Sequence, residues 1–142
     1  MIILDTNVLS ALMRTTPEAP VVAWLDRQPP ESVWITSITL SEARLGLALL
    51  PTGRRRQTLE AAFAQLLKED LENRVLDFDR AAATEAASLA AEQQKAGRPV
   101  YMRDTQIAGI ALARRATLAT RNARHFRDLK FPVVDPWTDV DD

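Results

Sequence analysis

The chain opens with Met1-Ile2-Ile3-Leu4-Asp5-Thr6-Asn7-Val8-Leu9, a short apolar run that ends at an aspartate. Because every position from Ile2 to Leu4 is apolar and the run is too short for a helix, it predicts a buried strand. From Thr6 to Met13 the pattern predicts a short helix, opened by a threonine or asparagine cap. A strand that passes directly into a helix is typical of parallel α/β proteins.

The same alternation of strand and helix continues along the chain. Further strands are predicted at residues 33–35, 75–76, 117–119 and 132–134. Helices are predicted between Pro17 and Pro29, at about residues 40–50, after Gly53, from an Asp79 cap to about Gln94, and over roughly a dozen residues after Asp104. This pattern predicts an α/β fold in which a central parallel sheet has helices on both faces. We expect residues 1–142 to form one domain.

Composition limits the chemistry that is open to the chain. It contains no cysteine, which excludes disulfides, zinc–thiolate sites and thiol nucleophiles. The N-terminal apolar run is too short for a signal-peptide core, and no apolar stretch approaches the length of a bilayer span. We therefore expect a cytoplasmic protein that does not enter membranes.

Basic residues are unevenly distributed, although the formal net charge is only −1. From Arg98 to Phe126 there are six arginines and one histidine against a single acid, Asp104. Two interpretations stay open: codon bias in an arginine-rich proteome, or a phosphate-binding stripe, since the guanidinium group matches phosphate geometry. Composition alone does not separate them.

Four polar residues occupy positions that a parallel sheet brings to one edge. Asp5 ends the first strand, and Glu42 lies in the first turn of the helix after the second strand. Asp104 begins a late helix, and Asn122 follows the strand at 117–119. Ligands of open parallel sheets bind at the carboxyl ends of the strands. Carboxylates gathered there repel one another unless a cation neutralises them, and oxygen ligands alone suit Mg²⁺ or Mn²⁺.

Local sequence motifs around these residues sharpen the prediction. In chain order they are Leu4-Asp5-Thr6-Asn7-Val8-Leu9, Thr39-Leu40-Ser41-Glu42-Ala43-Arg44-Leu45-Gly46, Arg103-Asp104-Thr105-Gln106-Ile107-Ala108 and Ala119-Thr120-Arg121-Asn122-Ala123-Arg124-His125-Phe126. With this order and spacing the sequence resembles PIN-domain ribonucleases, specifically VapC-type toxins of type II toxin–antitoxin systems (the FitB-like branch). The resemblance extends over essentially the whole chain, as far as Val134-Asp135-Pro136-Trp137.

The resemblance implies an endoribonuclease that uses Mg²⁺ or Mn²⁺ to cut single-stranded or loop RNA. It also implies a cognate VapB-type antitoxin that neutralises the activity. Asp5, Glu42 and Asp104 match the acidic, metal-holding site of the family, and Asn122 matches its fourth catalytic position. Many members have aspartate at that fourth position, so the asparagine here leaves one negative charge fewer for a second metal ion.

The implied mechanism uses no side-chain nucleophile. The absence of cysteine excludes a thiol route and the single histidine, His125, rules out a histidine pair, which leaves a metal-activated water. Thr6 and Thr120 match hydroxyl positions of the family that orient ligands or water. Arg103 and Arg121 flank the acids and are the predicted contacts to RNA phosphates.

Other interpretations stay open for single residues and for the whole chain. Asp5 could act only as a helix cap and Asn122 only as a turn residue. Asp79 is predicted to cap a helix rather than to join Asp77 in the site, and His125 is predicted to be a turn or surface residue. For the whole chain, the alternative is a PIN-like RNA-binding or interaction module whose nuclease site is degenerate.

Apolar side chains of the early helices predict a surface for partners. We expect a homodimer, and a groove that receives the antitoxin as a helix or an extended strand. Exposed apolar positions are predicted near Leu9, Leu12, Met13, Leu45 and Leu49. The alternative is that these five residues belong to the ordinary core.

Overall fold

The computed structural model describes residues 1–14, 16–126 and 128–139. Its strands are β1 (Ile2–Leu4), β2 (Val33–Thr36), β3 (Val75–Leu76), β4 (Thr117–Ala119) and β5 (Val133–Val134). They form one sheet in the order β3-β2-β1-β4-β5, and all neighbouring strands are parallel. The predicted parallel sheet is confirmed.

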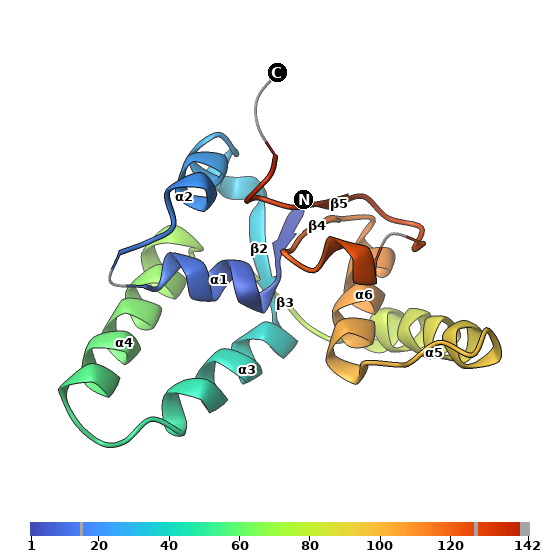
Figure 1. The fold of residues 1–142 in the computed structure, drawn as a ribbon, viewed down its shortest axis with the longest axis horizontal. Helices are drawn as coiled ribbons and strands as arrows, with labels where there is room; N and C mark the ends of the chain where they lie inside the picture. Colours follow the sequence, from blue (N-terminus) through green and yellow to red (C-terminus); the bar gives the residue numbers. More distant parts are fainter. Residues whose placement is uncertain (15, 127, 140–142) are drawn as a thin grey trace.

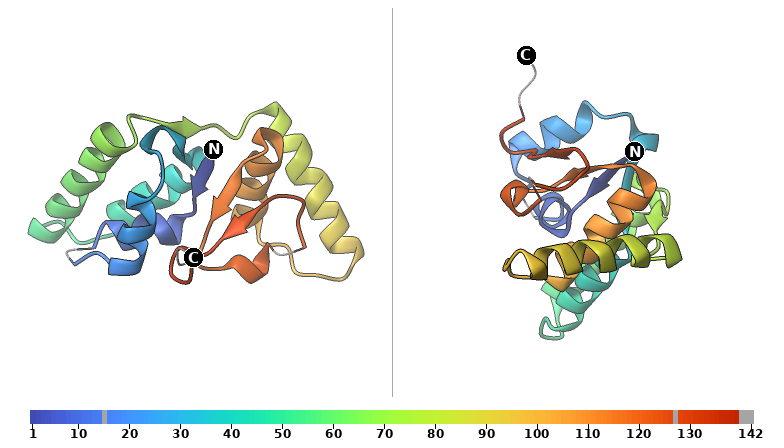
Figure 2. Two further views of the ribbon diagram at one scale, coloured as in Figure 1. Left: turned by 90° about the horizontal axis from the view of Figure 1, so that it is seen from above. Right: turned by 90° about the vertical axis from the view of Figure 1, so that its right-hand side faces the viewer.

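The α-helices that the structure describes lie on both faces of this sheet (Figures 1 and 2). They are α1 (Thr6–Leu12), α2 (Ala19–Asp26), α3 (Ser37–Ala48), α4 (Arg54–Gln65), α5 (Arg80–Lys95) and α6 (Met102–Arg114). A π-helical turn, Leu66–Asp70, continues α4, and 3₁₀ turns lie at Pro30–Ser32 and Ala123–His125. In Figure 1, α1, α2 and α4 lie to the left of the sheet, and α5 and α6 lie to its right.

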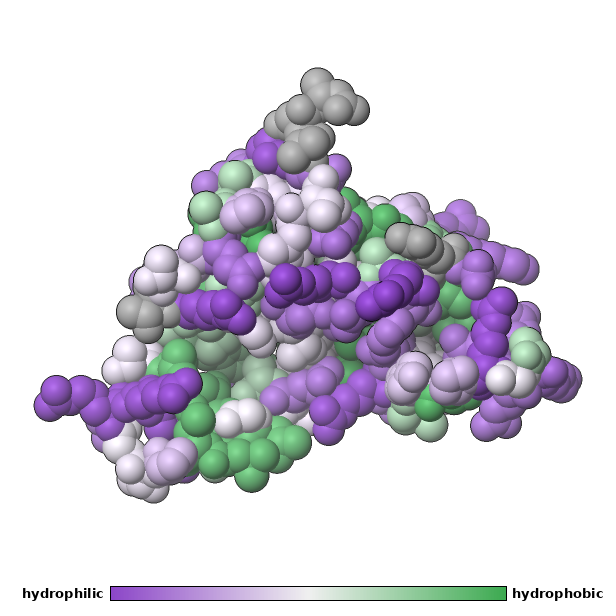
Figure 3. Space-filling view, in the orientation of Figure 1, coloured by the Kyte–Doolittle hydropathy of each residue, from purple (hydrophilic) through white to green (hydrophobic). Residues whose placement is uncertain are grey.

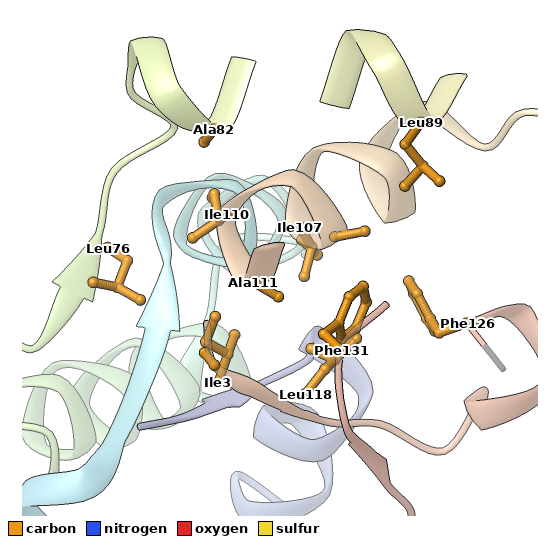
Figure 4. Close-up of a cluster of buried hydrophobic side chains, with 12 residues drawn as sticks. Ile3, Leu76, Ala82, Leu89, Ile107, Ile110, Ala111, Leu118, Phe126 and Phe131 are labelled. Atoms are coloured by element: carbon orange, nitrogen blue, oxygen red, sulfur yellow. The ribbon is translucent and has the colours of Figure 1, made fainter. Parts of the chain in front are cut away.

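Successive side chains of the central strands face opposite layers of helices. Ile3 of β1 and Leu118 of β4 pack in the core formed with α5 and α6, and Figure 4 shows the side chains of α6 gathered over them. The next residues, Leu4 and Ala119, pack in the core formed with α1, α2, α3 and α4. Both faces of the strands are therefore buried, which explains why the strands are apolar at nearly every position.

Two helices begin differently from the prediction because of their caps. α1 is capped by Asp5, whose Oδ1 accepts from the Thr6 N–H at 2.8 Å, so the prediction of a threonine or asparagine cap was wrong. α3 begins before the predicted start near Leu40. There the Thr36 hydroxyl accepts from the Thr39 N–H at 3.1 Å, which satisfies a backbone donor at the first turn.

Helices α5 and α6 approach each other closely at Gly109. A Cβ atom added to Gly109 would lie 2.6 Å from the carbonyl oxygen of Ala82 and 2.8 Å from the Cβ of Ala86. One of these neighbours is backbone, so the clash is relieved only if the helices separate. Glycine is therefore required here for packing.

Gly109→Ala should lower the free energy of unfolding by about 1–3 kcal/mol, the usual effect of overpacking a core. Gly46→Ala is the matched control, because Gly46 lies within α3 and a Cβ there would meet no atom within 4 Å. That control should raise stability by about 1 kcal/mol through helix propensity alone. Chemical denaturation measures both changes, and a Gly109→Ala protein as stable as the wild type would contradict the close packing.

Candidate active site

The candidate site lies where the strand order reverses, between the carboxyl ends of β1 and β4. β2 pairs with β1 on one side and β4 pairs with it on the other. The chain therefore adds β2 and β3 on one side of β1 and then crosses back to add β4 and β5 on the other side. Open α/β sheets bind ligands at such a switch point. Asp5 follows β1 and Thr120 follows β4, and the Thr120 hydroxyl donates to Asp5 Oδ2 at 2.7 Å. This bond and a second one, from the Asp5 N–H to the Ala119 carbonyl oxygen at 2.9 Å, join the two strand ends.

Asp5 is the innermost acid of the site, with only 5% of its surface exposed. Burial raises the pKa of the Asp5 carboxyl above its ordinary value of 3.8, whereas hydrogen bonds from Thr120 and Thr6 lower it. The negative charges of Asp104 and Glu42 raise this pKa further, which shows that the three acids are close enough to interact. Asp5 serves both as the cap of α1 and as a member of the acidic cluster.

The raised pKa of Asp5 predicts how stability depends on pH in a chelator. Between pH 3.8 and the higher pKa of the folded protein, the folded state binds more protons than the unfolded chain. The free energy of unfolding therefore falls as the pH rises through this window. Asp5→Asn keeps a good cap and removes the buried charge, so it should be more stable than the wild type at pH 7 and equally stable below pH 3.8.

Melting temperatures of both proteins across this pH range measure the effect. Addition of Mg²⁺ should narrow the difference at pH 7, because a cation offsets the repulsion among the acids. An Asp5→Asn protein that melts below the wild type at pH 7 in chelator would contradict the prediction. It would mean that the hydrogen bonds to the ionised Asp5 carboxylate stabilise the folded protein more than burial of its charge destabilises it.

Glu42 projects from α3 toward the same edge and is held between two neighbours. The Thr6 hydroxyl donates to Glu42 Oε1 at 3.0 Å and also lies 3.1 Å from the Thr39 hydroxyl. Arg103 Nη1 donates to the other carboxylate oxygen, Oε2, at 3.2 Å. Thr6, predicted as a supporting residue, is thus placed against an acid of the site. Arg103, predicted to contact RNA, is placed at its rim.

Asp104 lies in the first turn of α6 and contacts His125, which was not predicted to belong to the site. Its Oδ2 is 3.3 Å from His125 Nδ1, and the His125 ring stacks on Tyr101 with 5.5 Å between ring centroids and 12° between planes. His125 was predicted to be a turn or surface residue. It does lie in a 3₁₀ turn and is partly exposed, but it also belongs to the site. Only its nearness in sequence to Asn122 pointed to this.

The segment after β4 places Arg121 and Asn122 at the outer rim. The Arg121 guanidinium lies 4.8 Å from the ring centroid of Trp137, and its backbone N–H donates to Asn7 Oδ1 at 3.2 Å. The Asn122 side chain is exposed, and within the described residues it forms no hydrogen bond. Its backbone N–H donates to the Thr120 hydroxyl at 3.1 Å. A direct catalytic role of Asn122 stays a prediction.

The carboxylate oxygens of the site are of the chemical type that binds divalent cations. They are not arranged around one point as the ligands of a bound ion would be. Among the described residues, no three histidine, aspartate or glutamate side chains lie close enough to share one ion. Glu42 and Asp104 instead contact Arg103 and His125. A cation bound between the acids would neutralise the carboxylate charges in place of these basic side chains. The residues therefore fit the predicted Mg²⁺ or Mn²⁺ chemically.

The arginine-rich stretch does not form one continuous stripe. Arg98 pairs with Asp128 at 2.9 Å, whereas Arg114 at the C-terminal end of α6 pairs with Asp79 at 2.9 Å. α6 is about 20 Å long, so Arg114 is far from Asp104 in the first turn. Asp79 caps α5 as predicted, accepting from the Ala82 N–H.

An apolar groove runs from the site between α1, α3 and α4. It encloses about 750 Å³, and Thr6 and Glu42 lie at its active-site end, while Arg54 and Arg55 lie along it. Leu45 of α3 and Leu49, directly after this helix, are exposed, and Figure 3 shows hydrophobic surface in this region. Leu9 is 1% exposed, so its predicted exposure was wrong: α1 turns this side chain into the core. Leu12 and Met13 are partly buried against the same core.

A parallel α/β fold with acidic side chains at its switch point is typical of proteins that bind a ligand at the carboxyl ends of the strands. The chain belongs to the PIN-domain family, whose model matches residues 2–132. Within the described residues no helix has the length and hydropathy needed to cross a bilayer.

Curated relatives cover nearly all of the chain. Plasmid stability protein StbB of Pseudomonas syringae pv. tomato is 40% identical over 96% of this chain and 99% of its own length. VapC ribonuclease Y4jK of Sinorhizobium fredii is 36% identical over 96% of this chain and 98% of its own. Toxin FitB of Neisseria gonorrhoeae is 36% identical over 98% of this chain and 100% of its own. The resemblance to VapC and FitB toxins is confirmed.

Solved structures agree with these relatives. A chain in the structure of FitAB bound to an IR36 DNA fragment superimposes with a TM-score of 0.89 at 35% identity, over 99% of both chains. FitAcB from Neisseria gonorrhoeae gives a TM-score of 0.83 at 34% identity, over 97% of this chain and 99% of that one.

Proposed function

We propose that this chain is the toxin of a VapBC-type pair, a metal-dependent endoribonuclease that cuts single-stranded or loop RNA in the cytoplasm. We further propose that residues 1–142 form a single PIN domain and that the toxin is a homodimer. The observation that carries the proposal is the position of three acids at the switch point of a PIN-domain sheet, where Glu42 and Asp104 each lie near the buried Asp5. Relatives named as a VapC ribonuclease and a toxin support the activity.

The acids are the residues that would hold the metal. Asp5 and Asp104 are its proposed primary ligands, and Glu42 either completes the ligand set or orients the attacking water. When bound, Mg²⁺ or Mn²⁺ polarises the scissile phosphate and the attacking water. Thr120 and Thr6 keep the carboxylates of Asp5 and Glu42 in place through the hydrogen bonds at 2.7 Å and 3.0 Å.

The rim arginines supply the contacts to RNA phosphates. Arg103 is held by the Glu42 carboxylate and Arg121 by the Trp137 ring, and both arginines are exposed. Each guanidinium is itself exposed, so it can exchange its present partner for a phosphate oxygen. A flexible single strand reaches such a narrow acidic site more easily than a duplex does.

Purified protein should cut a single-stranded RNA when Mg²⁺ or Mn²⁺ is present and should stop cutting when a chelator removes the metal. Denaturing gel electrophoresis of an end-labelled RNA measures the reaction, and a duplex of the same sequence serves as the control substrate. If the chain is instead a binding module with a degenerate nuclease site, RNA should bind but should not be cut, whichever metal ion is added. Cleavage that persists in chelator would contradict the proposed use of the acids.

A further inference from the structure

A second hollow adjoins the acidic site on the side of α5 and α6. Its volume is about 230 Å³, and Asp104 forms part of its lining. Leu89, Ala108 and Phe126 supply apolar walls. Pockets for drug-sized ligands enclose about 300–1,000 Å³, so this cavity has room for one small ring system beside the reacting phosphate.

One residue that lines this cavity has a buried polar atom without a hydrogen-bond partner. Gln93 of α5 lines the cavity, and its Oε1 is buried without any hydrogen bond to the residues that the structure describes. Buried polar atoms are almost always hydrogen bonded, so a turn of the Gln93 side chain toward the cavity would let a donor on a bound ligand satisfy this acceptor. Nucleobases carry ring N–H or amine donors at their edges.

An aromatic pair forms another wall. Tyr101 and His125 both line the cavity and are stacked on each other with their planes 12° apart. Tyr101 is 55% exposed, so its ring is accessible to a further stacking partner. Proteins that bind single-stranded nucleic acids commonly stack bases on such exposed aromatic rings.

The charges around the cavity suit the backbone that would accompany a base. Arg124 lines the cavity and forms no ion pair with the described residues, whereas Arg98 is paired with Asp128. An arginine without a carboxylate partner is available to a phosphate.

We propose that this cavity is a subsite for one unpaired nucleobase, next to the phosphate that is cut. The base stacks on the Tyr101–His125 pair and donates a hydrogen bond to Gln93 Oε1, while Arg124 contacts an adjacent phosphate. This inference rests on the proposed ribonuclease function and adds a residue that reads the RNA. Gln93 is thereby a residue of the protein that selects which base the subsite accepts.

The first experiment measures binding without cleavage. Wild-type protein is titrated with adenosine 5′-monophosphate and with ribose 5-phosphate, which lacks the base, and binding is followed by NMR. The nucleotide should bind about 10-fold more tightly through stacking. Gln93→Leu should weaken nucleotide binding about 5- to 10-fold, the effect of one hydrogen bond, and leave ribose 5-phosphate unchanged. Equal affinity for the two probes would overturn the subsite.

Two further variants separate the subsite from a general effect on folding. Gln94→Leu is the matched control, because Gln94 is exposed on the same helix and does not line the cavity. It should bind both probes as the wild type does. Tyr101→Ala removes an exposed ring and should reduce the advantage of the nucleotide over ribose 5-phosphate. A nucleotide advantage that survives both Gln93→Leu and Tyr101→Ala would overturn the proposal.

The second experiment uses short single-stranded RNAs in which one position at a time is abasic. For intact RNA, Gln93→Leu should lower kcat/KM about 5- to 10-fold, and the loss should vanish when the nucleotide at the subsite is abasic. RNA cleavage that is identical in Gln93→Leu and wild type for every substrate overturns the subsite and leaves the nuclease function standing. Gln93-dependent nucleotide binding without any RNA cleavage overturns the nuclease function and leaves the subsite standing.

Discussion

Asp104→Asn should reduce metal-dependent RNA cleavage at least about 100-fold, because a preorganised charge at a reacting phosphate contributes several kcal/mol to the transition state. The substitution keeps the shape of the side chain and removes its charge. Asp104 is partly exposed and its only described side-chain contact is with His125, so the core is unaffected. The measurement is kcat/KM for single-stranded RNA at saturating Mg²⁺, and Asp5→Asn should give a loss of similar size.

Asp77→Asn is the matched control for this experiment. Asp77 also directly follows a strand, β3, but that strand is at the far edge of the sheet from β4, and the Asp77 side chain is exposed. Its substitution should leave cleavage within about twofold of the wild type, as expected for a surface change away from the site. An Asp104→Asn protein that cuts at the wild-type rate would show that the acidic site is wrongly assigned.

Formation of a complex with the cognate antitoxin should abolish cleavage. At an antitoxin concentration about 100 times Kd only about 1% of the toxin stays free, so the rate should fall about 100-fold and the melting temperature should rise. The groove between α1, α3 and α4 is the proposed binding surface. It is mainly apolar and ends at Thr6 and Glu42, so a bound segment would extend to the acids. Cleavage by the purified complex measures the effect.

Thr58→Arg and Gln57→Arg form a matched pair for the groove. Both residues are exposed on α4, but only Thr58 lines the groove. A bulky charge at Thr58 should weaken the complex at least about 10-fold without disturbing the core, whereas the same change at Gln57 should leave affinity unchanged. A tight complex that still cuts RNA at the rate of the free toxin would contradict the proposed blocking of the site.

Much of the fold was predictable because its signals are local. The apolar runs at Ile2–Leu4 and Thr117–Ala119 identify the two central strands, since a strand buried on both faces has little room for polar side chains. Asp79 correctly predicted the start of α5, because a cap depends only on hydrogen bonds to the first turn of its own helix. Caps were harder to assign where several polar residues follow one another, as at Asp5 and Thr6, and there the prediction chose the wrong one.

The environment of each site residue was not predictable to the same degree. The sequence order placed Asp5, Glu42 and Asp104 at one edge of a sheet, but it did not show that Arg103 pairs with Glu42 across 61 positions of the chain. Apart from the nearness of His125 to Asn122 in the sequence, nothing indicated that His125 reaches Asp104. Such contacts depend on how far α3 and α6 extend beyond the strands and on which rotamers their packing leaves free.

By itself, the sequence determined the class of fold and the edge of the sheet at which the acids lie, because hydrophobic period and residue chemistry belong to short segments. The divalent cation that these carboxylates would bind stays a prediction. Only the tertiary structure decided that Asp5 is buried with a raised pKa, that Leu9 enters the core, and that Gln93 borders a cavity beside Asp104. Burial, pKa shifts and cavities arise from atoms far apart in the chain. They exist only once the crossovers have set the distances between helices.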